Sequence, residues 1–299
     1  MSDECLGIDL GGTKIEGVRM GPAGRVLHRY RIPTNQEDGY EAILDRIRQV
    51  VSELEGSGGR LPLGIGTPGS ISSRDGTLKN SNTQCLNGKR LHEDLQTLLE
   101  RKIHLENDAN CFALAESKLG AARNSAVVFG VILGTGVGGG IILGGKIWSG
   151  PQHIAGEWGH HKIDDRGHLC YCGGRGCVES RLSGPALSQS YREATGKASD
   201  AAGVVQDLRD GHSEAREVFS GWIQNFGRAM ANVINILDPE VVVLGGGLSN
   251  IDEIYEMGPP AIAAHLFNDE LCTPIMRNEL GDSAGVLGAA LLAKSTTNG

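Results

Sequence analysis

Apolar residues recur along the chain at two spacings, one typical of helices and one of strands. Residues 40–56 read YEAILDRIRQVVSELEG, with apolar side chains three and four positions apart on one face of a predicted helix. The apolar run at 61–71 predicts a strand and a turn, and the runs at 103–107 and 240–247 predict strands. Further helices are predicted at 92–102, 108–120, 217–237 and 284–294. This alternation predicts an α/β protein whose ligand crevice lies at the carboxyl ends of the strands.

Two segments far apart in the chain resemble each other. Residues 7–21 read GIDLGGTKIEGVRMG and residues 130–144 read GVILGTGVGGGIILG, and glycines and apolar residues match in register. Each copy is an apolar strand, a glycine turn and a second strand, which predicts a β-hairpin. Two unrelated glycine-rich hairpins are the alternative. A repeat this far apart points to two related domains rather than to a solenoid, whose repeats recur at much shorter periods. The unbroken register favours a duplication over two unrelated hairpins.

The length of 299 residues suits two domains of similar size better than one core. We expect a small N-terminal α/β domain over residues 1–120, joined by a C-terminal helix at 284–299. A larger C-terminal α/β domain is expected over residues 121–283.

Composition and charge exclude several classes of protein. The net charge is −8 and no basic cluster stands out, which argues against a nucleic-acid partner. No apolar run approaches the ~20 residues that span a membrane. The first residues, MSDECLGIDL, lack the basic-then-apolar pattern of a secretion signal, so a cytoplasmic protein is expected. Glycine accounts for 45 of 299 residues, gathered in short clusters that favour turns approaching a ligand.

The glycine turns of the repeat are candidates for binding phosphate. Neither has the G-x-x-x-x-G-K-[ST] pattern of a P-loop, and either one alone is more typical of a tight turn. Backbone N–H groups in such turns can approach phosphate oxygens, so a pair of turns can hold a triphosphate. The candidate nucleotide-binding residues are Gly11, Gly12, Thr13 and Lys14, then Gly134, Thr135 and Gly136, and, for adenine or ribose, Gly245, Gly246 and Gly247.

Two aspartates are candidates for the chemistry. Asp9 has Ile132 as its counterpart in the second copy, and an acid beside a phosphate turn suits a hydrated Mg²⁺. Asp108 follows Asn107 where the strand at 103–107 gives way to a helix. A hydroxyl that attacks a γ-phosphate needs a carboxylate to accept its proton. The structural alternatives are a turn-stabilising role for Asp9 and a helix N-cap for Asp108.

Three of the seven cysteines, Cys170, Cys172 and Cys177, lie close together in the segment 156–179. An odd total excludes complete pairing, a C-x-C pair is awkward for a disulfide, and the C-x-x-C redox motif is absent. With one histidine, the three form a Cys₃His set suited to a structural Zn²⁺. His160, His161 and His168 are all near enough in sequence to be the fourth ligand.

Taken together, the motifs resemble the ROK family (repressors, open reading frames and kinases) of the hexokinase–actin superfamily. They are 9-DLGGTK-14, 66-GTPG-69, 107-NDAN-110, 134-GTGVGGG-140, 156-GEWGH-160, C-x-C-G-x-x-G-C-x-E at 170–179, and 245-GGG-247. The resemblance implies a duplicated actin-like (ribonuclease H-like) fold with a nucleotide and sugar cleft between two domains. It also implies an ATP-dependent kinase acting on the C6 hydroxyl of a hexose.

The resemblance assigns roles to individual residues. Asp108 is the catalytic base, Mg²⁺ is held through water near Asp9, and His160 is the fourth zinc ligand beside the three cysteines. A homodimer is the habit of the family. The sugar-binding residues implied are Gly69, Asn82, Asn107, Asp108, Glu157, His160 and Glu179.

The segment 76–95, GTLKNSNTQCLNGKRLHEDL, most resembles bacterial fructokinases and manno(fructo)kinases. It predicts that fructose is converted to fructose 6-phosphate, with mannose as a further substrate. An N-acetylglucosamine kinase or glucokinase of the same family is the alternative. A sugar-sensing regulator without catalysis and an actin-like ATPase are alternatives from other classes.

Overall fold

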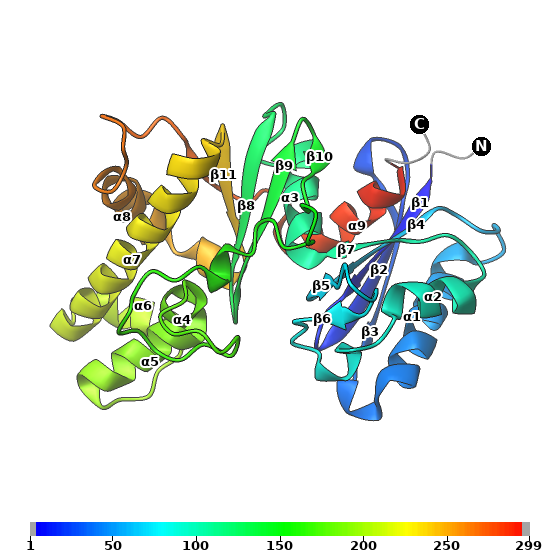
Figure 1. The fold of residues 1–299 in the computed structure, drawn as a ribbon, viewed down its shortest axis with the longest axis horizontal. Helices are drawn as coiled ribbons and strands as arrows, with labels where there is room; N and C mark the ends of the chain where they lie inside the picture. Colours follow the sequence, from blue (N-terminus) through cyan, green and yellow to red (C-terminus); the bar gives the residue numbers. More distant parts are fainter. Residues whose placement is uncertain (1–3, 295–299) are drawn as a thin grey trace.

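The computed structural model describes residues 4–294, so the last residues of the predicted helix 284–299 lie outside it. The described chain forms two five-stranded sheets, which lie in the two halves of the molecule in Figure 1. The first sheet has the order β3-β2-β1-β4-β7, with β1 (Cys5–Leu10), β2 (Lys14–Met20), β3 (Val26–Pro33), β4 (Leu63–Thr67) and β7 (His104–Asn107). The second has the order β10-β9-β8-β11-β12, with β8 (Val127–Leu133), β9 (Val137–Leu143), β10 (Lys146–Ile147), β11 (Val241–Gly245) and β12 (Ile275–Arg277).

The two sheets repeat the same plan. In the first, β1 pairs antiparallel with β2 and parallel with β4. In the second, β8 pairs antiparallel with β9 and parallel with β11. The predicted hairpins at 7–21 and 130–144 are therefore β1–β2 and β8–β9, at equivalent places in the two sheets. The prediction of a duplicated α/β fold is confirmed.

Helices cover the first sheet on both faces. Helix α1 (Tyr40–Glu55) buries the predicted apolar face, from Ile43 and Ile47 to Leu54, and packs on β2 and β3. Helix α9 (Ala284–Lys294) packs on β1 and β4. It approaches closely because Gly64 has no side chain, and a Cβ there would overlap the carbonyl oxygen of Ala289. Helix α2 (Leu91–Leu99) packs against α1.

The second sheet is covered by the long helix α7 (Ser213–Leu237), which begins before the predicted residue 217. Its aromatic side chains Phe219, Trp222 and Phe226 stack in the core, with ring centroids 5.8 Å apart in each pair. The periodicity analysis missed four α-helices and four strands in the described chain. The helices are α4 (Glu179–Leu182), α5 (Gly184–Thr195), α6 (Ala201–Arg209) and α8 (Asp252–Ala263). The strands are the largely exposed edge strand β3, β10, β12 and β6 (Leu78–Lys79), which forms a small two-stranded sheet with β5 (Ser70–Ile71).

Helix α3 (Asp108–Leu119) lies between the two sheets. It follows β7 of the first sheet directly, but it packs on β8 and β9 of the second and against α9 (Figure 1). Its first residue is therefore held where the two halves of the molecule meet. The division at residue 120 stays a prediction. Within residues 4–294, no helix has both the length and the apolar character needed to cross a membrane.

Candidate active site

Asn107 and Asp108 stand at the junction of β7 and α3, and Asn107 is the helix N-cap. The Asn107 Oδ1 atom accepts a hydrogen bond from the Ala109 N–H at 2.9 Å, and its Nδ2 donates to the Gly69 carbonyl at 3.0 Å. An N-cap satisfies backbone donors that have no partner within the helix. The capping role considered for Asp108 is thus filled by its neighbour, although Asp108 Oδ1 also accepts from Ala109 N–H at 2.8 Å.

The two candidate carboxyls have environments that favour their protonated forms. Burial, followed by the charges of Asp9 and Glu157, raises the pKa of Asp108 to about 7. Burial, followed by the charge of Glu16, raises the pKa of Asp9 to about 6 against the opposing charge of Lys14. A carboxyl with a pKa near 7 is suited to accept a proton at neutral pH.

Asp9 and Asp108 line one cavity of about 550 Å³ together with Gly11, Gly246 and Gly247. The first predicted glycine turn and the glycine cluster 245–247 contribute residues to this cavity, whereas the second glycine turn does not. Ile132, the counterpart of Asp9 in the repeat, lines it as well. The other predicted nucleotide-binding residues do not line it: Gly12, Thr13, Lys14, Gly134, Thr135, Gly136 and Gly245.

The glycine turns are tight and closed by backbone hydrogen bonds. Gly11 N–H donates to the Lys14 carbonyl at 2.9 Å, and Gly134 N–H donates to the Gly136 carbonyl at 2.9 Å. The Lys14 ammonium lies 3.3 Å from the buried Glu16 carboxylate, so this lysine already has an anionic partner.

The segment after β12 also lines the cavity of about 550 Å³, and sequence analysis did not single it out. Asn278, Glu279, Gly281 and Asp282 contribute to its wall, as does Gly285 at the start of α9. A Cβ on Gly285 would lie 3.1 Å from Asp9 Oδ2, so the helix start approaches the carboxylate closely. These residues are polar and glycine-rich, as surface loops are, and no known spacing marks them.

A second cavity, of about 1140 Å³, contains two of the predicted sugar-binding residues, Glu157 and His160. Burial is the largest influence on Glu157 and raises the pKa of its carboxyl. Part of the cavity wall is apolar and comes from Ile141, Ile154 and Val233.

The remaining predicted sugar-binding residues lie outside the lining of this cavity. Asn107 is hydrogen-bonded to Gly69, as described above. Glu179 Oε2 accepts from the Val137 N–H at 3.0 Å, which holds its carboxylate beside the second glycine turn. Asn82 is exposed beside the first turn, where a Cβ on Gly12 would lie 4.0 Å from Asn82 Oδ1.

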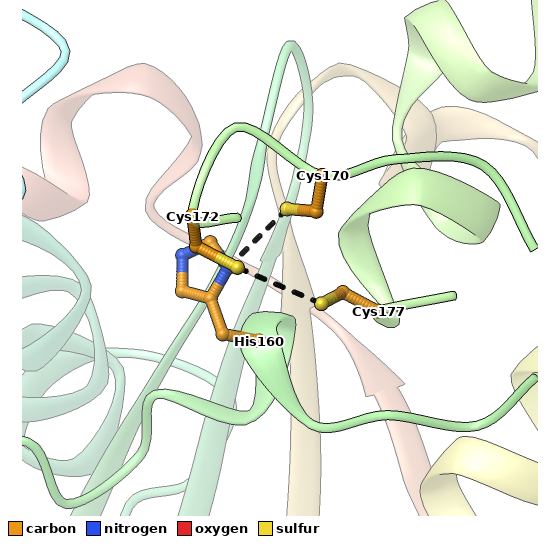
Figure 2. A group of neighbouring side chains, drawn as sticks. All are labelled: His160, Cys170, Cys172 and Cys177. Atoms are coloured by element: carbon orange, nitrogen blue, oxygen red, sulfur yellow. Dashed lines mark hydrogen bonds between the residues drawn. The ribbon is translucent and has the colours of Figure 1, made fainter. Parts of the chain in front are cut away.

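His160, Cys170, Cys172 and Cys177 converge on one point (Figure 2), with their ligand atoms within 4.8 Å of one another. The Sγ atoms of Cys172 and Cys177 are 3.7 Å apart, and Cys170 Sγ is 3.6 Å from His160 Nδ1. Ligands around a tetrahedral Zn²⁺ would be separated by about 3.8 Å for two sulfurs and about 3.5 Å for nitrogen and sulfur, given the usual bond lengths. The four residues therefore fit a zinc ion.

The other two candidate histidines have different partners. His161 Nε2 lies 3.3 Å from Asn232 Nδ2, and His168 Nε2 lies 3.4 Å from Glu193. Of the three, only His160 belongs to the cysteine cluster in the described chain. Its second ring nitrogen, Nε2, lies 3.1 Å from the Tyr171 hydroxyl.

Comparison with known proteins identifies the family. The model of the ROK family matches residues 5–296. The chain belongs to the ROK family. Its fold is the hexokinase–actin-like fold of the ROK sugar kinases, as the motifs predict. A ROK hexokinase from Thermus thermophilus superposes with a TM-score of 0.89 at 32% identity, covering 99% of this chain and 100% of that one.

ROK relatives with named substrates are also similar over nearly their whole length. An N-acetyl-D-glucosamine kinase from Vibrio atlanticus (strain LGP32) is 39% identical, with 96% of this chain and 98% of the relative covered. An N-acetylgalactosamine kinase from Shewanella sp. (strain ANA-3) is 36% identical, with 96% and 95% covered. These relatives favour the predicted alternative substrate over fructose.

Proposed function

We propose that this ROK protein transfers the γ-phosphoryl group of ATP to the C6 hydroxyl of N-acetyl-D-glucosamine. The observation that carries the proposal is the position of Asp108. It lines the nucleotide cavity, and its carboxyl is close enough to Glu157, in the wall of the larger cavity, for the two charges to interact. A base in this position can reach both a γ-phosphate and a sugar hydroxyl.

Asp108 then accepts the proton of the sugar hydroxyl as its oxygen attacks the γ-phosphorus, and ADP leaves with the bond electrons. In this proposal ATP lies along the cavity with its phosphates near Gly11. Asp9 would hold Mg²⁺ through water, and the ion would supply neutralisation of charge on the phosphate oxygens. Positioning and electrostatics supply most of the rate, and the base contributes about 10²–10⁴-fold.

The apolar part of the larger cavity supports an N-acetylated sugar. Glu157 and His160 are polar groups that suit sugar hydroxyls, whereas Ile141, Ile154 and Val233 offer nothing to a hydroxyl. An acetamido methyl group gains by leaving water for such a wall, typically by about 1 kcal/mol. Fructose and glucose, the other predicted hexoses, have no apolar substituent to place there.

We propose further that the Cys₃His cluster binds a structural Zn²⁺. A closed set of four ligands leaves no position for substrate, so the ion acts on structure alone. The ion would fix the loop 160–177. This loop begins at His160, which lines the larger cavity, and leads to Glu179, which is held beside the second glycine turn. The implied homodimer and the cytoplasmic location stay predictions.

ADP release with Mg-ATP tests the proposal across N-acetyl-D-glucosamine, N-acetyl-D-galactosamine, glucose and fructose. We expect kcat/KM for N-acetyl-D-glucosamine to exceed that for glucose by about 10–200-fold, the range that one apolar group can provide. A preference for fructose would refute N-acetyl-D-glucosamine as the substrate but would support the proposed kinase activity. Zinc-replete, folded protein that releases no ADP with any of these sugars would overturn the proposed activity.

A further inference from the structure

We propose that Glu116 is a positioning residue that fixes one wall of the nucleotide cavity to the helix bearing Asp108. The inference rests on the proposed function only in taking that cavity as the ATP site. Glu116 lies near the C-terminal end of α3, is fully buried and carries a carboxylate that touches neither cavity.

The Glu116 carboxylate accepts three backbone hydrogen bonds. Its Oε1 accepts from Leu280 N–H at 3.0 Å, and its Oε2 accepts from Glu279 N–H at 3.2 Å. Oε2 also accepts from Ala121 N–H at 2.9 Å, at the turn that ends α3. Hydrogen bonds to a charged acceptor in a buried place are stronger than neutral ones, and losing the acceptor leaves the donors unsatisfied.

The surroundings leave space for this carboxylate. Gly120 lies directly beside it, and a Cβ on that glycine would overlap Glu116 Oε2. A glycine at the end of a helix commonly serves a left-handed turn, but Gly120 has φ −115°, which any residue adopts. The absence of a side chain at Gly120 therefore serves the carboxylate rather than the backbone.

The two long-range bonds hold the segment 278–283, which lines the nucleotide cavity between β12 and α9. At its ends, Asn278 N–H donates to the Leu244 carbonyl at 2.9 Å, and Ser283 Oγ accepts from Arg29 at 2.9 Å. In the middle, the Glu279 side chain forms an exposed ion pair with Arg123 at 3.3 Å. Exposed ion pairs contribute little, so we assign the buried hold on the backbone of the middle of the segment to Glu116. Because α3 is a continuous helix with a rise of about 1.5 Å per residue, Glu116 lies about 12 Å from Asp108 along its axis, and one rigid element connects the two residues.

Steady-state kinetics of Glu116→Gln and Gly120→Ala test the inference. Glu116→Gln keeps one acceptor oxygen and replaces the other by an NH₂ group, which faces backbone N–H donors. Gly120→Ala displaces the Glu116 carboxylate without removing it. For both we expect the KM of ATP to rise about 10-fold or more and the KM of the sugar to change less than about twofold. Glu55→Gln is the matched control. Its carboxylate accepts from Leu61 N–H at 2.9 Å and pairs with Arg101, and it lines neither cavity, so it should lower thermal stability with both KM values unchanged.

Calorimetric binding of a non-hydrolysable ATP analogue, without sugar, separates this inference from the proposed activity. A parent protein that binds the analogue but phosphorylates no sugar would refute the activity and leave the test of Glu116 intact. Equal rises in both KM values, or unchanged analogue affinity in folded Gly120→Ala, would overturn the positioning role. If Glu116→Gln does not fold, amide hydrogen exchange of the parent protein, together with the kinetics of Gly120→Ala, tests the positioning role of Glu116. The amides of Glu279 and Leu280 should be protected, and exchange as fast as in the exposed segment 57–60 would refute the anchor.

Discussion

Asp108→Asn should destroy activity and stabilise the protein at the same time. The amide cannot accept the proton of the attacking hydroxyl, so we expect kcat to fall about 10²–10⁴-fold. Stability should rise because the parent carboxyl is held where its charged form is disfavoured by burial, by Asp9 and by Glu157. The two expected effects have one cause, since the surroundings that would suit Asp108 to act as a base also disfavour its charged form.

The sign and size of the stability change follow from the pKa of Asp108, raised from 3.8 to about 7. A folded-state pKa above the unfolded value favours folding while the group is protonated, and this advantage is lost as pH rises from about 4 to about 7. Each tenfold change in acidity corresponds to about 1.4 kcal/mol, so the charge destabilises the fold by up to about 4 kcal/mol at pH 8. At pH 5 the same reasoning gives a destabilisation less than half as large as at pH 8.

Thermal unfolding of ligand-free protein at pH 8 and pH 5 measures the effect. The variant should melt several degrees above the parent at pH 8, with a smaller difference at pH 5. Asp75→Asn is the control with the opposite sign, because hydrogen bonds from Thr77 and Ser72 hold the pKa of Asp75 well below its usual range. It should melt below the parent at pH 8. If Asp108→Asn is no more stable than the parent at pH 8 while Asp75→Asn behaves as stated, the electrostatic account of the site is wrong.

Cys172→Ala should lose both bound zinc, measured by elemental analysis, and activity. Cys272→Ala, which replaces an exposed cysteine outside the cluster, should keep both. Normal kinetics in zinc-free protein would contradict the structural role of the ion. Gly136→Ala should raise the KM of the sugar about 10-fold, because the added Cβ would lie 2.7 Å from Glu179 Oε2 and push that carboxylate away; an unchanged KM would remove Glu179 from the sugar site. The kcat/KM of the parent should fall about tenfold per pH unit below about pH 7 as Asp108 takes up its proton, and a flat profile down to pH 5 would exclude it as the base.

The parts of the fold that sequence predicted well are those where burial imposes a period. The face of α1 and the two glycine hairpins are confirmed, because strands and helices buried on one side repeat their apolar residues regularly. Strand β3 was missed for the opposite reason: it is an edge strand with most of its side chains exposed, so no alternation between buried and exposed residues marks it. Helix α8 contains Pro259 and Pro260, and proline is typical of positions where a helix is interrupted, so these residues do not indicate a helix.

The candidate site divides in the same way. Residues with distinctive chemistry, such as the Cys₃His set, could be found from spacing, and the structure brings them together. The segment 278–283 could not be found, because its role depends on hydrogen bonds to Glu116 from far along the chain. Sugar preference was also beyond the motifs, since the apolar wall combines Ile154 with Val233 of α7, which no local pattern links.

Strands β1 and β8, which are equivalent in the two hairpins, each contribute to the cavity proposed to bind ATP. A cavity with true twofold symmetry would accept a phosphate chain equally well in either direction. Asp9 and Ile132, equivalent positions in the two copies, both line it, and one is an acid while the other is an apolar side chain. In the proposed ATP site, the metal-bearing end of the nucleotide would be drawn to Asp9 and would gain nothing from Ile132. This divergence between the copies would orient ATP in the cavity, with its terminal phosphate towards the proposed base.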